Sequence, residues 1–328
     1  MKSVDELGLF QYFQSFGSEE SCVEHLVNSR KSDGITCKCC KEVTKHYYIR
    51  SIKQFRCSIC RAKTGLRSDT YMADSNLPVH YWYFATYMMT NLTKSLSARE
   101  MQRQIGHKFY EPIWYMMHKI RTTMKKRDDL YSIGESLEVD EGYIDTYLTK
   151  LEKDERPKLI STKLKRRTQG IDKDYHTPVL VVAESKYTTN DNKWKPNKSV
   201  RYIRLIGLED RSKEGLSHEL TKLLKGGESV VTDGYVAYKD IFKKLGVNHA
   251  AIKPESWEPK DVILDEHLPW VHKVLSNFKR NILNAHHSIS HKYIDNYLAE
   301  FQYKFNRRMH RQFKFEHLIG AGLSMRWD

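Results

Sequence analysis

The sequence predicts an α/β fold with a small metal-stabilised module ahead of the main domain, and three observations indicate this. Residues 137–307 contain three runs patterned as antiparallel strands, then alternating helices and strands, then helices. Five of the six cysteines lie between residues 37 and 60, a clustering that in a reducing compartment indicates a metal site. With 328 residues and 40% hydrophobic content, the chain can bury a full core, and its length suggests about two domains.

A pair of Cys-x-x-Cys motifs predicts a zinc ribbon in residues 31–72. Cys37 and Cys40 form the first pair, and Cys57 and Cys60 form the second. Each pair can offer two sulfurs to one tetrahedral ion, so we expect a structural four-thiolate zinc site that stabilises a module with little core of its own. Cys39 is then a spare thiol, because it could replace Cys40 only at the wrong spacing.

The two ends of the chain carry weaker patterns. Residues 1–30 have apolar side chains at helical spacing and are expected to form an N-terminal helical arm. Cys22 in this arm is expected to be a buried small hydrophobe. Residues 311–328 are expected to be a C-terminal tail.

Residues 73–128 have the outline of a helix-turn-helix region. Ser97 followed by Glu100 is a capping box, and Gly106 ends that short helix before the next one begins. The outline fits an ordinary helical hairpin as well as a DNA-reading unit. We favour DNA binding because of the basic residues Arg99, Arg103, Lys108 and Lys119 in this region.

Two acidic residues in strand settings are candidates for a catalytic metal site. Residues 229–235 have the pattern of a buried strand that delivers Asp233 to its exposed tip, with Gly234 turning the chain into a helix. Residues 137–143 alternate between apolar and acidic side chains, as in a half-exposed strand carrying Asp140. Neither motif is specific alone, since Asp before Gly is often only a turn residue. Together, in a strongly basic chain, they indicate a metal-holding pair.

The charge of the chain favours a polyanionic partner. The formal net charge is +14 and the isoelectric point is near 9.3, so nucleic acid is the default partner. The basic segment 148–176 is either a solubilising loop or a clamp for a DNA backbone. We favour the clamp, whose basic residues are Lys163, Lys165, Arg166 and Arg167. The apolar stretches are too short to cross a bilayer and no signal-peptide pattern is present, so we expect an intracellular protein of the cytoplasm or nucleoid.

These motifs resemble the zinc-ribbon DDE transposases of bacterial insertion sequences, the ISXO-like group that is related to eukaryotic Merlin elements. The resemblance covers nearly the whole chain. It includes the paired Cys-x-x-Cys motifs, Val-Asp-Glu at 139–141, the basic loop, Thr-Asp-Gly-Tyr at 232–235, Lys-Arg at 279–280 and a closing Tyr-x-x-Glu-Phe to Phe-Asn-Arg-Arg pattern at 297–308. It implies that residues 129–310 form a ribonuclease H-like catalytic domain whose acidic residues hold two magnesium ions.

The sequence departs from the family pattern at the third metal ligand. The family helix reads His-x-Asn-x-x-Glu; here His267 matches, but Pro269 and His272 stand at the Asn and Glu positions. Some branches of the family use Asn, which makes Asn277 an alternative. At about 100° per residue, His272 and Lys279 lie roughly 20° apart on one helix face, while Asn277 lies roughly 140° from His272. The two candidates cannot easily share one metal, and we favour His272.

The resemblance implies phosphoryl transfer by metal-dependent strand cleavage and strand transfer, on transposon terminal inverted repeats and target DNA, by a homo-oligomer. Asp140 would bridge both metals and Asp233 would hold one, through the hard oxygen ligands that suit Mg²⁺. The imidazole of His272 would suit Mn²⁺ at least as well. Lys279 and Arg280 are expected to contact DNA phosphates. Glu141 would point to the opposite side of the strand from Asp140.

Other functions remain open. A catalytically impaired, transposase-derived DNA-binding protein would keep the fold without the chemistry. A zinc-ribbon transcription regulator would need only the ribbon and the helix-turn-helix, and the motifs beyond residue 130 argue against it. A related nuclease or resolvase would keep the acids but cut DNA without joining strands.

Overall fold

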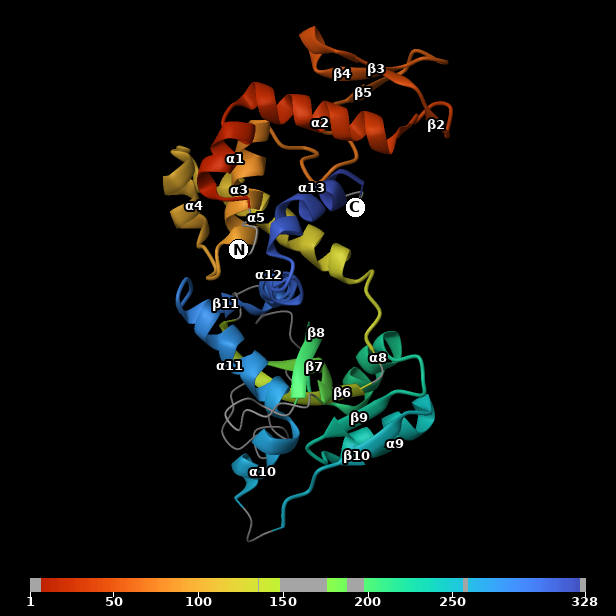
Figure 1. The fold of residues 1–328 in the computed structure, drawn as a ribbon, viewed down its shortest axis with the longest axis vertical. Helices are drawn as coiled ribbons and strands as arrows, with labels where there is room; N and C mark the ends of the chain where they lie inside the picture. The colour runs from red at the N-terminus through yellow and green to blue at the C-terminus, as the bar shows by residue number, and fades with distance from the viewer. Residues whose placement is uncertain (1–6, 135, 148–175, 188–197, 256–258, 325–328) are drawn as a thin grey trace, which may run out of the picture. The chain divides into compact units, whose positions relative to one another are not determined.

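The computed structural model divides into two compact units (Figure 1), and its sheet of α/β type lies in the second. The structure describes residues 7–134, 136–147, 176–187, 198–255 and 259–324. The first unit comprises Met1–Asp128 and Arg307–Asp328, and the second comprises Asp129–Asn306.

Helices with a largely aromatic core form most of the first unit. They are α1 (Leu9–Phe16), α2 (Glu19–Asp33), α3 (Val79–Asn91), α4 (Ala98–Ile105), α5 (Tyr110–Asp128) and α13 (Lys314–Ser324), with the short 3₁₀ segments η1 (Arg50–Ile52) and η4 (Arg311–Phe313). Tyr12, Trp82, Tyr83 and Phe315 are among the buried residues of this core. Such rings contribute large apolar areas, which explains how a small unit closes a core.

The segment expected to be a C-terminal tail contains helix α13 instead. Its Phe315, Leu318, Ile319 and Leu323 are buried, and the helix packs against α2, α3 and α5. The apolar residues recur at helical spacing, so one face of α13 can be removed from water. Residues 314–324 therefore form a packed helix of the first unit, within the segment where the sequence predicts a tail.

The ribbon of the first unit consists of two small antiparallel sheets. β1 (Ile35–Thr36) pairs with β2 (Val43–Thr44), and β4 (Gln54–Cys57) lies between β3 (His46–Ile49) and β5 (Lys63–Gly65). Helix α2 is joined to the ribbon by Arg30, which donates hydrogen bonds to the carbonyl oxygens of Gly65 and Leu66 and lies over the ring of Phe55. Because Arg30 is buried and satisfied by these partners, it fixes the ribbon to the helix.

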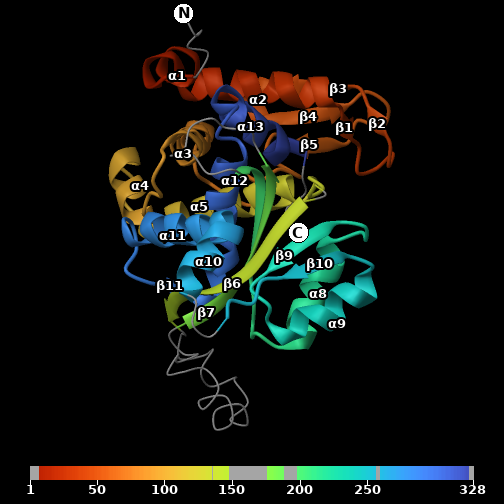
Figure 2. The ribbon, with the colours of Figure 1, turned by 60° about the horizontal axis from the view of Figure 1, so that its bottom comes forward.

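The second unit is built on a mixed sheet with the strand order β10-β9-β6-β7-β8. The strands are β6 (Ser136–Tyr147), β7 (His176–Tyr187), β8 (Lys198–Gly207), β9 (Ser229–Thr232) and β10 (Asn248–Ala251). β6, β7 and β8 pair antiparallel, whereas β9 runs parallel to β6 and to β10. Figure 2 shows the long strand β6 between β7 and β9. The predicted α/β class, with three antiparallel strands first, is confirmed.

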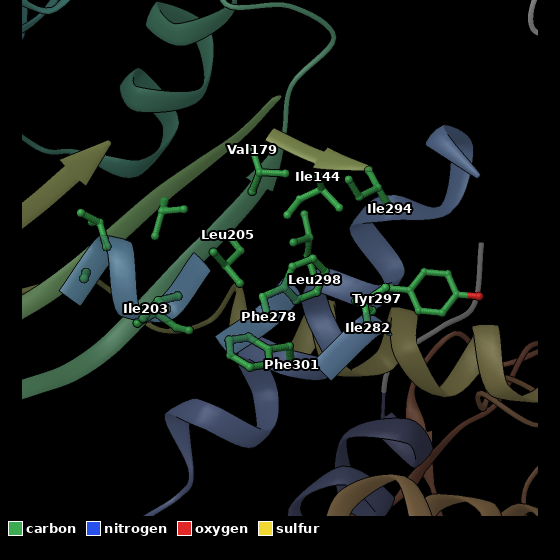
Figure 3. Packing of buried hydrophobic residues seen from close by; sticks show 14 of the residues in the cluster. Ile144, Val179, Ile203, Leu205, Phe278, Ile282, Ile294, Tyr297, Leu298 and Phe301 are labelled. Atoms are coloured by element: carbon green, nitrogen blue, oxygen red, sulfur yellow. The ribbon is translucent and has the colours of Figure 1, made fainter. Parts of the chain in front are cut away.

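Helices cover the two faces of this sheet. One face packs against α8 (Lys213–Leu223) and α9 (Val236–Leu245). The other packs against α10 (Lys260–His267), α11 (Pro269–Leu283) and α12 (Ile294–Asn306), and a short β11 (Ile289–Ser290) and η3 (His291–Tyr293) precede α12. Figure 3 shows sheet residues such as Ile144 and Leu205 facing Phe278 and Leu298 of these helices.

The alternation of side chains along β6 assigns each of its residues to one of the two faces of the sheet. Leu137 and Val139 belong to the core with α8 and α9, and Ile144 belongs to the core with α11 and α12. Odd-numbered residues of β6 therefore face α8 and α9, and even-numbered residues face α11.

In the described part of the chain, no helix has the length and apolarity that a membrane span requires.

Candidate metal centres

The four predicted zinc ligands form one compact cluster. The Sγ atoms of Cys37 and Cys60 are 3.5 Å apart, and those of Cys40 and Cys57 are 4.0 Å apart. Four sulfurs around a tetrahedral zinc at about 2.3 Å from each would be about 3.8 Å apart. The cluster therefore has the size that one zinc ion requires. Among the described residues, it is the only group of at least three His, Cys, Asp or Glu ligands whose ligand atoms all lie within 4.8 Å of one another.

Each Cys-x-x-Cys motif sits in a tight turn of the same geometry. The Cys37 amide donates to the carbonyl oxygen of Glu42, and the Cys57 amide donates to that of Ala62, both at 2.9 Å. The residue after the second cysteine of each motif has a left-handed backbone, with φ of 63° at position 41 and 64° at position 61. The two turns thus present their sulfurs in equivalent ways to one ion.

The hydroxyl of Thr44, 3.2 Å from Cys57 Sγ, is the main cause that lowers the pKa of this thiol to about 5. A lowered pKa favours the thiolate, the form that binds metal. Cys39 is exposed and outside the cluster, and Cys22 is buried among apolar residues, where burial raises its pKa to about 12. Both cysteines lie where the sequence predicted.

Strand register brings the two candidate catalytic acids to neighbouring parts of the sheet. Glu138 of β6 pairs with Val231 of the parallel strand β9. Asp140 lies two residues further along β6, on the face that packs against α11, and Asp233 follows the end of β9, two residues beyond Val231. Two segments far apart in the sequence therefore carry acids at corresponding positions of adjacent strands.

Helix α11 runs along β6 and brings His272 to Asp140. The Trp270 amide donates to Glu138 Oε2 at 2.8 Å, and His272 Nε2 lies 3.2 Å from Asp140 Oδ2. Two residues further along β6, a Cβ on Gly142 would collide with the side chain of Leu275. These successive contacts fix the rotation of α11 about its axis. The Asp140 and His272 side chains are 15% and 31% exposed, so the pair remains open to a ligand.

Asn277, the alternative third ligand, lies elsewhere on α11. It is exposed, and its Oδ1 accepts a hydrogen bond from Arg280 at 2.7 Å. Lys279 is exposed as well. The opposite, apolar stripe of the helix is buried through Val271, Val274, Phe278 and Ile282.

Asp233 follows the last residue of β9 in a turn that requires glycine. The Tyr235 amide donates to Asp233 Oδ1 at 3.0 Å. Gly234 has a φ of 80°, and a Cβ there would lie 2.8 Å from the Lys253 side chain. The ligand atoms of Asp233, Asp140 and His272 do not all lie within 4.8 Å of one another; among the described residues, only the thiol cluster meets that distance.

Two residues near the site escaped the sequence analysis. Glu138 is fully buried and accepts from the N-terminal turn of α11, where a negative charge is favourable. Arg211 donates to Glu141 Oε2 at 2.8 Å. For Glu138, the alternation along residues 138–140 is a signal, because it puts Glu138 on the same face as Asp140. For Arg211, nothing near position 211 in the sequence indicates that it pairs with Glu141.

Glu141 lies on the opposite face of β6 from Asp140, against Tyr238 of α9 and Arg211 of the segment before α8. Its side chain is fully buried, and its other carboxylate oxygen accepts from the Tyr238 hydroxyl. Burial raises the pKa of the Glu141 carboxyl, against the opposing effects of the Arg211 charge and the Tyr238 hydrogen bond. The pKa of Tyr238 is raised too, first by burial and then by the adjacent Glu141.

The predicted DNA-binding residues differ in how they are presented. Arg99 lies over the ring of Tyr110, and Arg103 is 76% exposed but pairs with Glu100 at 2.6 Å. Lys119 is partly buried, and its ammonium group donates to the Ala73 carbonyl oxygen.

Ser97 caps α4 by accepting from the Glu100 amide, and Gly106 ends the helix in a left-handed conformation. The basic residues Lys163, Lys165, Arg166 and Arg167 lie outside the described residues.

Comparison with known proteins identifies two segments of the chain. Residues 133–306 match the family model of the ISXO2-like transposase domain, and residues 17–63 match that of a transposase zinc-ribbon domain. Among solved structures, a crystal structure of a pre-cleavage Mos1 transpososome matches at 9% sequence identity, with a TM-score of 0.28 over 71% of this chain and 76% of that chain. No curated protein matches the chain.

Proposed function

Because the chain belongs to the ISXO2-like transposase family and carries the transposase zinc ribbon, we propose that it binds the ends of an insertion sequence and catalyses metal-dependent DNA strand cleavage and strand transfer. The observation that supports this most directly is the contact between His272 Nε2 and Asp140 Oδ2, on the strand next to the one that Asp233 follows. Each of these groups comes from a different segment of the chain.

The topology of the second unit supports a ribonuclease H-like assignment. The first strand is central, the second is antiparallel to it, and the fourth lies parallel on its other side, giving the order β10-β9-β6-β7-β8. In such a sheet, an acid within the first strand and an acid after the fourth strand become neighbours. Asp140 and Asp233 occupy these two places.

The donor set suits a divalent cation with a preference for oxygen ligands. Two carboxylates on one face offer hard ligands to Mg²⁺, and an imidazole beside one of them also suits Mn²⁺. A bound metal would polarise the phosphodiester and stabilise charge on the attacking and leaving oxygens. The residues that would hold it are Asp140, Asp233 and His272.

The remaining residues would bind and orient DNA. Lys279 and Arg280 are exposed beyond His272 on α11, where their charges can contact phosphates. Arg99 and Arg103 on α4 are candidates for contacts with the element ends. The basic loop around Lys163, Lys165, Arg166 and Arg167 is a further candidate for the backbone.

The test is cleavage of a labelled DNA fragment carrying the element end, in Mg²⁺ or Mn²⁺. We expect Asp140→Asn and Asp233→Asn each to reduce cleavage by at least about 100-fold while leaving DNA binding intact, because each removes one charged metal ligand. Asp240→Asn is the matched control, since Asp240 is an exposed acid on α9 that pairs with Lys213.

Two outcomes would decide against the proposal. Cleavage that survives in both the Asp140 and Asp233 variants would place the chemistry elsewhere. Tight end binding by the wild-type protein with no cleavage in either metal would favour the impaired, DNA-binding alternative.

A further inference from the structure

The two candidate metal-binding carboxylates are oriented in the same manner. The Glu141 amide donates to Asp140 Oδ1 at 2.8 Å, and the Tyr235 amide donates to Asp233 Oδ1 at 3.0 Å. Each carboxylate thus takes its orientation from a backbone N–H close by in the sequence. The distance between the two carboxylates therefore depends on how residues 141 and 235 are held relative to each other.

One side chain contacts both of these residues. Arg211 Nη2 donates to Glu141 Oε2 at 2.8 Å, and the guanidinium carbon lies 4.5 Å from the centroid of the Tyr235 ring. The Tyr235 hydroxyl in turn donates to the Arg211 carbonyl oxygen at 3.3 Å. Arg211 lies between β8 and α8, so it belongs to neither of the segments that carry the acids.

The energetics of this contact make Arg211 difficult to replace. The Glu141 side chain is fully buried, and Arg211 is the cation paired with it. A buried carboxylate that loses its cation is strongly disfavoured, so Glu141 either takes up a proton or moves, and its contact with the guanidinium is lost in both cases. The planar guanidinium can pair with the carboxylate and stack on the ring at the same time, which an ammonium does less well.

We propose that Arg211 is a positioning residue that sets the spacing between the Asp140 and Asp233 carboxylates, through Glu141 on one side and Tyr235 on the other. The inference rests on the proposed function in one respect: the two carboxylates hold a divalent cation. The charges of Arg211 and Asp233 interact through space, but among the described residues no hydrogen bond joins Arg211 to either carboxylate. Its loss should therefore weaken cation binding without removing a ligand.

The same unit contains a matched control for a purely structural role. Arg201 lies 3.6 Å from Glu184, whose side chain is 3% exposed, and its guanidinium carbon lies 5.1 Å from the centroid of the Tyr202 ring. It thus pairs with a buried glutamate and stacks on a tyrosine, as Arg211 does. Arg201 is on β8, at the edge of the sheet away from β9.

The experiment compares Arg211→Met, Arg211→Lys and Arg201→Met in zinc-loaded, full-length protein. Mn²⁺ binding is measured by electron paramagnetic resonance and by calorimetry, and urea unfolding is measured in parallel. We expect Arg211→Met to weaken Mn²⁺ binding about tenfold or more, and Arg211→Lys to weaken it less, because the lysine keeps the charge. Arg201→Met should leave Mn²⁺ binding unchanged even if it destabilises the unit.

The outcomes separate this inference from the proposed function. If Asp140→Asn and Asp233→Asn leave Mn²⁺ binding unchanged, the proposed metal site itself is wrong. If those two variants lose Mn²⁺ but both Arg211 variants bind it as the wild type does, only the positioning role is wrong. Should Arg211→Met fail to fold, Arg211→Lys decides: normal Mn²⁺ affinity in that variant overturns the inference.

Discussion

His272 is the residue at which this chain and its family pattern disagree, and the structure gives it a defined neighbour. Its Nε2 lies 3.2 Å from Asp140 Oδ2, whereas Asn277 is exposed and bonded to Arg280. An imidazole can replace a carboxylate as a metal ligand, but it is neutral and softer. The substitution should therefore change the preferred metal more than the geometry.

We predict that His272→Ala abolishes cleavage of the element end in Mg²⁺ while DNA binding persists, because it removes a ligand next to Asp140. His272→Glu should retain activity and shift the preference from Mn²⁺ toward Mg²⁺, since a carboxylate is the harder ligand. The measurement is the cleavage rate across a titration of each metal. Asn277→Ala is the control and should be milder; full loss in Asn277→Ala with an active His272→Ala would make Asn277 the ligand.

At the scale of elements, the placement of α11 on β6 decides which helix residue meets Asp140. The helix contacts the strand at Glu138, Asp140 and Gly142 in succession. Gly142 matters because it has no Cβ, which lets Leu275 approach the strand. A side chain at position 142 would push the helix away and carry His272 with it.

Gly142→Ala is expected to lower the free energy of unfolding by about 1–3 kcal/mol, because the added methyl overpacks the Leu275 contact. Leu275→Ala should cost less in the Gly142→Ala background than in the wild type, since it relieves the collision. Urea unfolding of the four proteins measures this coupling. Gly320→Ala in α13 is the control: its Cβ meets no atom within 4 Å, so it should be neutral or stabilising. Additive effects at positions 142 and 275 would contradict the contact.

The zinc ribbon is the second element whose behaviour the structure predicts. We expect one zinc per chain, and Cys57→Ser should lose it, because a hydroxyl is a poor substitute for the thiolate of this tetrahedral site. The ribbon should then unfold and DNA binding weaken, while the sheet unit remains folded. Elemental analysis and circular dichroism measure these effects. Cys39→Ser is the matched control, since Cys39 is exposed outside the cluster; equal zinc loss in both variants would reject the ligand assignment.

For the molecule as a whole, the dominant property is its net charge of +14. Phosphate contacts by Lys and Arg release counterions, so affinity for DNA should fall steeply with salt, with each contact adding about 0.9 to the logarithmic slope. The net charge already subtracts the acid of each internal pair, such as Glu100 with Arg103. The number of phosphate contacts therefore depends on which basic side chains face the DNA, and the salt slope measures it.

We predict that affinity for duplex DNA falls by about 100-fold or more between 50 and 200 mM salt. Replacing Lys165, Arg166 and Arg167 together by Gln should reduce the slope if this loop holds the backbone. Replacing three exposed lysines of α8 and α9, Lys213, Lys222 and Lys239, makes the same change in charge elsewhere in the chain. An equal reduction in both triple variants would show that only the net charge matters.

Local patterns in the sequence determined several features without any structure. The zinc ligands follow from the spacing of Cys37, Cys40, Cys57 and Cys60, because each pair lies in one tight turn. The helix at 98–105 follows from the cap at Ser97 and the stop at Gly106, which depend on nearby residues only. Asp140 and Asp233 stand out because each interrupts or ends a short apolar strand.

Tertiary structure alone decided how these parts meet. The approach of His272 to Asp140 depends on the rotation and height of α11 on the sheet, which packing at Glu138 and Gly142 sets. The link from Arg211 to Glu141 and Tyr235, and the burial of α13, likewise join segments far apart in the chain. Residue spacing indicates turns and helix faces, but it does not determine which strands are neighbours in the sheet. Register and long-range packing supply that information, because they are set by the burial of whole faces rather than by neighbours in sequence.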